Sequence, residues 1–265
     1  PMKNKNTIII VAYNKPDLLY LYLEQLYSEP TIADYQIQIN TEVGYDPEQD
    51  HVLSLYKKTR PDVEIKQFIK PKHPSCPLPG YYNILSSYLY AADQEDAGEF
   101  VIVGEEDILP TKDYIRYNKY IYEHYLKKYP RIMGAAHKRR PEAELKGDYQ
   151  CTSLSVISTR AINDYLRPVL ENENLYHNPF FFYNLHFGHS RISPSDHTHH
   201  DGLVERVMDH HKLFVLKPDQ ARSMHVGLSG VFCKGKAPEG TLEERLSEWR
   251  ELIKDEYEES NINGR

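Results

Sequence analysis

Short runs of apolar, β-branched residues are the feature that most restricts how this chain can fold. Residues 7–13 read TIIIVAY and residues 100–104 read FVIVG. Each run is long enough for a strand, is shorter than a typical helix, and lacks the alternation of polar and apolar residues expected of a half-exposed strand. Strands of this kind are buried on both faces, which occurs mainly in parallel sheets covered by helices. The sequence therefore predicts an α/β protein with a mainly parallel sheet flanked by helices.

The segments between these runs support the same architecture. Residues 16–27 carry Leu19, Tyr22 and Leu23 at the spacing of one buried helical face. The alternation of strand and helix is regular in the first half of the chain and looser in the second, where residues 178–201 are predicted to be irregular. The predicted strands are residues 7–13, 35–42, 63–70, 100–107, 131–136, 151–159 and 214–216, and the predicted helices are residues 16–27, 80–94, 113–128, 160–166, 201–211 and 241–259.

Composition excludes several classes of protein. The net charge of -7 and the 27% of charged residues describe a chain without a general attraction to nucleic acid or anionic lipid. The longest apolar run near the start, residues 8–13, is too short to span a membrane, which needs about 20 apolar residues, so we expect a soluble, cytoplasmic protein. Cys76, Cys151 and Cys233 are odd in number and widely spaced, which favours neither a disulfide framework nor a zinc knuckle.

Three consecutive carboxylates, Glu105, Glu106 and Asp107, follow the second apolar strand directly. In an open parallel sheet, ligands bind beyond the carboxyl ends of the strands. Adjacent carboxylates repel one another, and a hard divalent cation such as Mg²⁺ or Mn²⁺ would offset that repulsion. Such ions commonly take one or two protein carboxylates and fill their other positions with substrate phosphates. The alternative is that the three residues cap the following helix and face water.

Five motifs in a fixed order resemble a known family. They are VAYNKP after the first strand, then GYYNI, GEEDILP, HHDGLVERV and ARSMHVGLSGV, and together they extend over residues 7–233. In this order they resemble the metal-dependent glycosyltransferases of the GT-A fold, and they are most similar to the β-1,2-N-acetylglucosaminyltransferase I family. The resemblance implies a Rossmann-like sheet, a nucleotide-sugar donor and a bound Mn²⁺ or Mg²⁺.

The same resemblance implies roles for residues of the first half. Asp107 would hold the metal directly, while Glu105 and Glu106 would contact the sugar, the ribose or metal-bound water. Glu42 corresponds to the family's uracil-reading acid, although both Glu42 and Glu106 replace an aspartate of the family pattern. The remaining residues expected to bind the nucleotide sugar lie in the first loop and at the start of the second helix: Ala12, Tyr13, Lys15 and Tyr81. Lys15 would neutralise phosphate charge, unless it is an exposed turn residue.

Residues of the second half would complete the reaction. Asp201 resembles the family's general base, which takes a proton from the acceptor hydroxyl as its oxygen attacks from the face opposite the leaving group, so the reaction would invert the anomeric centre. Its alternative role is that of a helix N-cap. Arg222 and Gly230 belong to a segment that would close over the donor. His225 would be a second metal ligand or, alternatively, a packed histidine.

The acceptor is less clearly indicated. Residues 195–200 are rich in histidine, but their spacing does not match a zinc site, so a loop on the acceptor side is the preferred interpretation. Residues 178–189 carry aromatic side chains that would either fill the core or stack on an acceptor. Residues 137–140 read HKRR, either an exposed basic loop or a contact for a phosphate-bearing acceptor. A glycan, a small molecule and a hydroxymethylated base of viral DNA remain open, as does a protein.

Together these features predict one GT-A-like domain over residues 1–265, in which residues 2–136 bind the nucleotide sugar and residues 137–265 bind the acceptor and carry the catalytic residue. The predicted function is inverting, divalent-metal-dependent transfer from a nucleotide sugar, most simply a UDP-sugar, to a hydroxyl acceptor. Two alternatives stay open. A sugar-nucleotide nucleotidyltransferase normally has a glycine-rich loop after the first strand, and VAYNKP has no glycine. A non-catalytic carbohydrate-binding protein would need the aromatic residues but not the carboxylates.

Overall fold

A computed structural model describes residues 5–70, 79–136, 138–139, 154–188, 200–217, 221–227 and 241–254. Seven strands form the main sheet in the order β3-β2-β1-β4-β8-β6-β9, and β5, β10 and β7 form a smaller one. The main sheet contains β1 (Lys5–Val11), β2 (Tyr35–Glu42), β3 (Glu64–Lys70), β4 (Ala97–Glu105), β6 (Ile132–Ala135), β8 (Val156–Ser158) and β9 (Phe214–Leu216). All pairs in this sheet are parallel except those of β8, which runs antiparallel between β4 and β6. The predicted α/β class is therefore confirmed.

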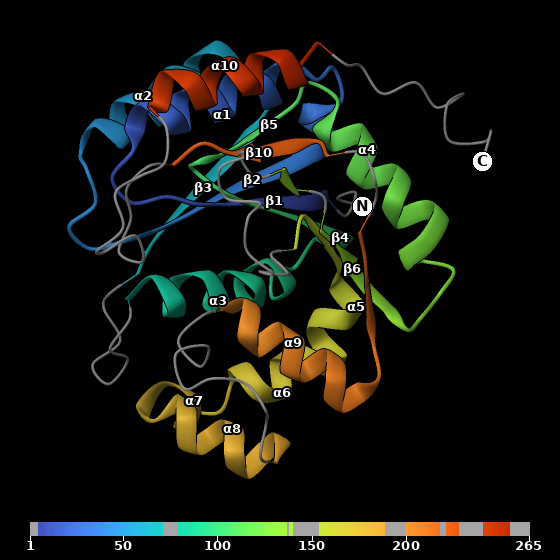
Figure 1. The fold of residues 1–265 in the computed structure, drawn as a ribbon. Helices are drawn as coiled ribbons and strands as arrows, with labels where there is room; N and C mark the ends of the chain where they lie inside the picture. The colour runs from blue at the N-terminus through green and yellow to red at the C-terminus, as the bar shows by residue number, and fades with distance from the viewer. Residues whose placement is uncertain are drawn as a thin grey trace.

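Helices cover both faces of the main sheet (Figure 1). On one side lie α1 (Pro16–Ser28), α2 (Glu48–Thr59) and α10 (Leu242–Leu252), and on the other side lie α3 (Pro79–Ala92), α6 (Arg167–Leu170) and α9 (His200–His211). The other described elements are η1 (Ile32–Asp34), β5 (Ile108–Pro110), α4 (Tyr114–Ile121), η2 (Tyr122–Leu126), β7 (Lys138–Arg139), α5 (Thr159–Ala161), η4 (Ile162–Leu166), α7 (Asn174–His177), α8 (Pro179–Phe187) and β10 (Ser223–His225).

The central strand β1 shows why this sheet needs two helical layers. Ile8 and Ile10 pack into one apolar cluster with α1 and α10, while Ile9, between them, packs into a second cluster with α3 and α9. All three side chains are fully buried. Successive side chains of a strand point to opposite faces, so a continuously apolar strand requires cover on both.

Several details differ from the sequence-based predictions. Helix α2 and the small second sheet were not predicted. Residues 178–201 were expected to be irregular, but α8 occupies Pro179–Phe187. Asn178 caps this helix, because its side chain accepts a hydrogen bond from the backbone N–H of Phe181. A helix was expected to end before Pro168, yet α6 continues through it. The π-helical turn η4 just before α6 resets the hydrogen-bond register, so Pro168 falls in the first turn of α6, where its missing N–H is tolerated.

Both predicted halves of the chain contribute strands to the main sheet, since β8 and β9 come from residues 156–216 while the other five strands lie before residue 137. Among the described residues, no helix is both long enough and apolar enough to cross a lipid bilayer.

Candidate functional site

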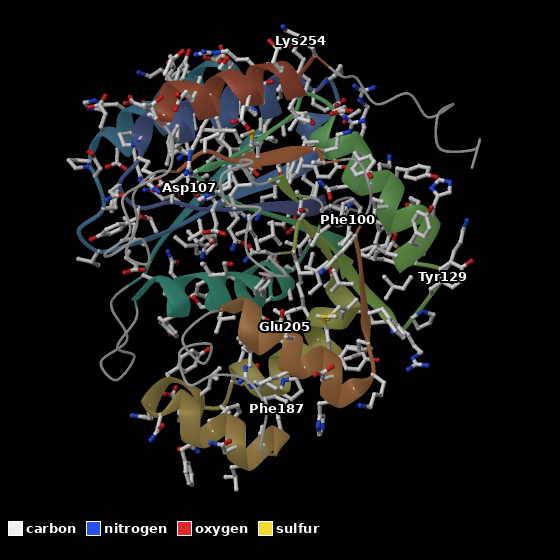
Figure 2. All side chains as sticks on the ribbon, in the orientation of Figure 1. Phe100, Asp107, Tyr129, Phe187, Glu205 and Lys254 are labelled. Carbon is white, nitrogen blue, oxygen red and sulfur yellow. The ribbon has the colours of Figure 1, made fainter. Side chains whose placement is uncertain are left out.

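The loops that follow β1, β2 and β4 meet at one edge of the sheet. Val11 pairs with Asn40 on one side and with Glu105 on the other, so β1 and β4 end at the same level and β2 extends two residues further. The backbone N–H of Ala12 donates to the carbonyl of Asn40, 2.9 Å away. This parallel register brings together residues that lie far apart in the sequence, as the carboxyl edge of an open sheet does in general. Asp107 lies at this edge, between the two helical layers (Figure 2).

Glu106 ties the first loop to the loop after β4. Its backbone N–H donates to the carbonyl of Val11 at 2.9 Å, and its side-chain Oε1 accepts from the backbone N–H of Asn14 at 3.1 Å. The other oxygen, Oε2, accepts from Nε2 of Gln49 in α2 at 3.2 Å. Only 5% of Glu106 is exposed, and this burial raises the pKa of its carboxyl group despite the hydrogen bonds from the backbone. Both carboxylate oxygens of Glu106 thus accept hydrogen bonds from protein groups. The predicted contact with the sugar or the ribose would have to share these same oxygens.

Asp107 sits where two cationic or basic side chains converge. Its Oδ2 lies 2.5 Å from Nζ of Lys15 and 3.6 Å from Nε2 of His225. Strand β10 positions His225, because β10 pairs antiparallel with β5 and the N–H of Val226 donates to the carbonyl of Asp107 at 2.8 Å. Burial alone would raise the pKa of Asp107, but the hydrogen bonds and charges of His225 and Lys15 hold it well below its usual range. The carboxylate is therefore ionised at neutral pH.

Gly227 allows the chain after β10 to pass close to this carboxylate. A Cβ atom at Gly227 would overlap Oδ2 and crowd Cγ of Asp107. From α10, Nη1 of Arg245 donates to the carbonyl of Gly227 at 2.6 Å, and Nε1 of Trp249 donates to the carbonyl of Pro110 in β5 at 3.1 Å. Helix α10 therefore holds both strands of the β5–β10 pair beside Asp107.

Glu105, the last residue of β4, has surroundings that differ from those of its two acidic neighbours. It lines a small cavity of about 10 Å³, together with Val11, Tyr88 and Ser223. This volume is about that of one water molecule. The three consecutive carboxylates thus meet different environments: Glu105 lines this cavity, Glu106 binds Asn14 and Gln49, and Asp107 meets Lys15 and His225.

Glu42 and Tyr13 lie together at the neighbouring strand end. Glu42 is buried at the end of β2, and its carbonyl accepts from the backbone N–H of Tyr45 at 3.1 Å. Gly44 in this turn has φ +92°, and the hydroxyl of Tyr13 would be 3.9 Å from a Cβ placed there. Tyr13 is 37% exposed, so part of its ring is open to a ligand near the turn that follows Glu42. This arrangement suits the predicted binding of a nucleotide base, which remains a prediction.

Arg222 does not join this cluster. Its guanidinium is only 4% exposed, its Nε lies 3.4 Å from Oδ2 of Asp113, and it packs 5.5 Å from the ring centre of Tyr117. Its carbonyl also accepts from the backbone N–H of Thr111 at 3.0 Å, at the end of β5 remote from Asp107. The predicted contact of Arg222 with the donor would require this buried ion pair to open.

The remaining predicted residues are placed only in part. Asp201 lies in the first turn of α9, which begins at His200. Tyr81 lies in the first turn of α3. Gly230 and residues 195–199 lie outside the described residues.

Asp107 and the residues beside it fit a divalent ion with six ligands, some of which a substrate would supply. Among the described side chains, no group of three or more His, Cys, Asp or Glu encloses an ion site. Asp107 and His225 nevertheless offer an oxygen and a nitrogen 3.6 Å apart, and adjacent ligands of an octahedral Mg²⁺ lie roughly 3 Å apart. A carboxylate and an imidazole also suit Mn²⁺. Phosphate oxygens and water would then supply the other ligands, as Mg²⁺ sites commonly require.

Sequence reasoning missed three positioning residues of this site: Asn14, Gln49 and Arg245. Asn14 acts through its backbone, which no side-chain pattern reveals. Gln49 and Arg245 are buried polar residues on amphipathic helices, and only the neighbours that they meet in the folded chain distinguish them from surface residues.

Glu106 provides a test of this electrostatic description. A buried carboxylate with a raised pKa costs free energy at neutral pH, so we expect Glu106→Gln to raise the free energy of unfolding by about 1 kcal/mol at pH 7.5. The new amide can keep the Asn14 contact, and Gln49 can turn its Oε1, which has no hydrogen-bond partner, towards it. Chemical denaturation of both proteins measures the difference.

The pH dependence of this gain has a defined sign. Wild-type stability rises as the pH falls from the raised folded pKa of Glu106 towards the ordinary value of 4.5, because the folded state binds the proton more tightly. The advantage of Glu106→Gln should therefore shrink between pH 7.5 and pH 4.5. Glu24→Gln, an exposed change in α1, should show no such trend. A variant less stable than wild type at pH 7.5 would contradict the assignment.

Comparison with known proteins gives matches at the level of fold. Neither a protein-family model nor a curated protein sequence matches the chain. Among solved structures, the mannosyltransferase PcManGT from Pyrobaculum calidifontis, in complex with GDP-Man and Mn²⁺, superposes on 86% of this chain with a TM-score of 0.53 and 14% identity. TarS of S. aureus, residues 1–349, superposes on 83% with a TM-score of 0.50 and 13% identity. The chain spans about three fifths of the length of each of these structures.

These matches agree with the α/β architecture described above. The seven-stranded sheet with one antiparallel strand, and the acidic cluster at the carboxyl end of β4, occur here in a fold shared with glycosyltransferases. The similarity extends to the fold and not to the β-1,2-N-acetylglucosaminyltransferase I family in particular. The chain has the α/β fold of the GT-A glycosyltransferases, as its sequence predicted.

Proposed function

We propose that this chain is a divalent-metal-dependent glycosyltransferase that moves a sugar from a nucleotide sugar to a hydroxyl acceptor, with inversion at the anomeric carbon. The observation that carries the proposal is the convergence of Lys15 and His225 on one oxygen of Asp107, at the carboxyl edge of a GT-A sheet. PcManGT, which shares the fold, was solved with GDP-Man and Mn²⁺. A cation-binding carboxylate at this edge supports a donor whose leaving group is a diphosphate.

The sheet edge divides into a base side and a phosphate side. Tyr13 and Glu42 would receive the base, with the exposed ring of Tyr13 stacking on it and the carboxylate of Glu42 accepting hydrogen bonds from it. Lys15 and the Asp107–His225 pair would receive the diphosphate. Glu105, at the end of β4 and two residues before Asp107, would contact the sugar, the ribose or metal-bound water, as the sequence resemblance predicts. Uracil is the base that the sequence resemblance predicts, and guanine is the alternative to be tested.

In the reaction, the acceptor oxygen attacks the anomeric carbon while the bond from that carbon to the β-phosphate oxygen breaks. Asp201 would take the proton of the acceptor hydroxyl as its oxygen becomes nucleophilic. A bound divalent ion would neutralise negative charge on the departing nucleoside diphosphate. Lys15 would donate a charge-assisted hydrogen bond to the same leaving group. Glu106, Gln49 and Arg245 would keep the loops in place during the reaction. The acceptor class, whether glycan, small molecule, protein or modified nucleic acid, is left to experiment.

A donor panel tests this function directly. The protein is incubated with UDP-sugars and GDP-sugars, with Mn²⁺ or with EDTA, and the release of UDP or GDP is measured. We expect slow release from at least one donor, because water replaces the acceptor inefficiently, and loss of release in EDTA. Release that persists in EDTA would contradict metal dependence, and no release or binding of any nucleotide sugar would contradict the function.

The same panel tests the general base once an acceptor is found. Asp201→Asn should keep the affinity for the donor and lower the rate of transfer by roughly 10²–10⁴-fold, because proton transfer from the acceptor then lacks a base. Asp209→Asn, at an exposed position of the same helix, is the matched control. Transfer by Asp201→Asn at the wild-type rate would exclude this role, and a product with the donor's anomeric configuration would exclude inversion.

A further inference from the structure

The ammonium group of Lys15 contacts Oδ2 of Asp107, the oxygen that would bind the metal ion in the proposed function. Nζ of Lys15 lies 2.5 Å from Oδ2 of Asp107, and Nε2 of His225 approaches the same oxygen from 3.6 Å. The side chains of Lys15 and Asp107 are 19% and 14% exposed, so water screens this pair only weakly. The lysine is therefore a direct competitor for the carboxylate and not a distant surface charge.

The backbone of Lys15 is fixed, while its side chain is long and flexible. Asn14, the preceding residue, is held by Glu106, and the following residue, Pro16, begins α1. A residue before proline is restricted to extended conformations, so the loop cannot simply carry Lys15 away from Asp107. The four methylene groups of the lysine side chain can rotate, however, and this moves the ammonium by several ångströms without changing the loop.

We propose that Lys15 is a built-in cation that holds Asp107 until the donor binds, and that it then moves from Asp107 to the diphosphate as the divalent ion takes its place. This inference rests on the proposed function, because it concerns the same metal and the same leaving group. Its consequence is that a divalent ion and a nucleoside diphosphate bind cooperatively, and that Lys15 is the residue through which they are coupled.

The charges at the site explain the coupling. Lys15 already offsets the charge of Asp107, and a divalent ion placed on the same oxygen would bring three positive charges to the two carboxylates of Asp107 and Glu106 in a poorly screened site. A diphosphate adds at least two negative charges, which both cations can share. The N-terminus of α1, directly after Lys15, also favours an anion at this point and disfavours a lone cation. The ion should therefore bind weakly alone and tightly together with the nucleotide.

Binding of Mn²⁺, followed by the paramagnetic resonance signal of the free ion, tests this inference without any turnover. Titrations use wild type, Lys15→Met and Asp107→Asn, each without nucleotide and with UDP or GDP. For wild type we expect weak binding that UDP or GDP strengthens at least tenfold. Lys15→Met should bind Mn²⁺ at least tenfold more tightly than wild type without nucleotide, and should gain much less from the nucleotide. Asp107→Asn should bind Mn²⁺ weakly under all conditions.

Two controls and two contrary outcomes complete the design. Lys58→Met removes an equal charge from an exposed position on α2 and should leave every Mn²⁺ affinity unchanged. Lys15→Gln, which keeps a polar end group, provides a second variant with the same expected direction, and circular dichroism checks that each variant is folded. If Lys15→Met and Lys15→Gln bind Mn²⁺ no better than wild type, the inference about Lys15 is wrong. In that case the proposed function still stands, provided that UDP or GDP strengthens Mn²⁺ binding by the wild type. If no variant binds Mn²⁺ even with UDP or GDP, both are wrong.

Discussion

Replacing Asp107 by asparagine is expected to lower the rate of donor cleavage and sugar transfer by about 10³-fold, because charge stabilisation of the leaving group by a bound ion accounts for several kcal/mol of the barrier. The substitution keeps the size of the side chain but removes the negative charge that Lys15 and His225 approach. Gly227 still leaves room for the amide, so the fold should be kept. The measurement is the rate of UDP or GDP release and of transfer at saturating Mn²⁺.

The loss of activity in Asp107→Asn should result from the position of this carboxylate in the site, and not from the change in net charge. Asp164→Asn, at an exposed position of η4, changes the net charge by the same amount and should retain full activity. Thermal denaturation should show that both variants are folded. If the activity of Asp107→Asn is within a few-fold of wild type, the carboxylate of Asp107 binds no catalytic ion. The proposed metal dependence would then be wrong.

Removing the carboxylate of Asp113 is expected to lower the free energy of unfolding by about 3–5 kcal/mol, the cost of leaving a buried charge without its partner. In Asp113→Ala, the guanidinium of Arg222 keeps its place behind β10, where both residues are almost fully buried. The hydroxyl of Thr111, which donates to Oδ1 of Asp113 at 2.5 Å, also loses this acceptor and keeps the carbonyl of Arg222 at 3.1 Å. Chemical denaturation measures the loss, and a smaller slope with denaturant would indicate a less compact native state.

A double-mutant cycle separates this anchoring role from the donor contact that the sequence resemblance predicts for Arg222. Removing both charges, in Arg222→Met with Asp113→Ala, should recover much of the stability that Asp113→Ala loses, because no buried charge remains. If Arg222 only anchors β10, the double variant should keep its affinity for UDP or GDP. A loss of nucleotide affinity that exceeds the loss of stability would show instead that Arg222 reaches the donor and that the buried pair opens.

The strands of the first half could be predicted because their pattern is local. Residues 7–13 and 100–104 are apolar without interruption, and a run of this kind has few ways to be buried other than as an inner strand. Helix α2 was missed because its mean hydropathy is low and only three of its residues, Gln49, Leu53 and Tyr56, are buried. Strands β5 and β10 were missed because each has three residues, and their pairing joins segments more than a hundred residues apart.

The acidic cluster could also be predicted, but its internal division of roles could not. The sequence places Glu105, Glu106 and Asp107 at a strand end, where like charges call for counter-charges. It does not show that Glu106 turns towards Gln49 and the backbone of Asn14, that Glu105 lines a cavity, or that only Asp107 meets Lys15 and His225. Three adjacent acidic residues thus lie in three different chemical environments.

The sequence by itself determined the sheet, its two-sided cover and the strand end that carries the carboxylates, since apolar periodicity and strand polarity act over a few residues. Only the tertiary structure decided which group each carboxylate faces. Asn14 and Lys15 lie 92 residues before their partners Glu106 and Asp107, and His225 comes from a strand that β5 and α10 hold in place. Over such separations, packing fixes the direction of a side chain, and no local pattern records it.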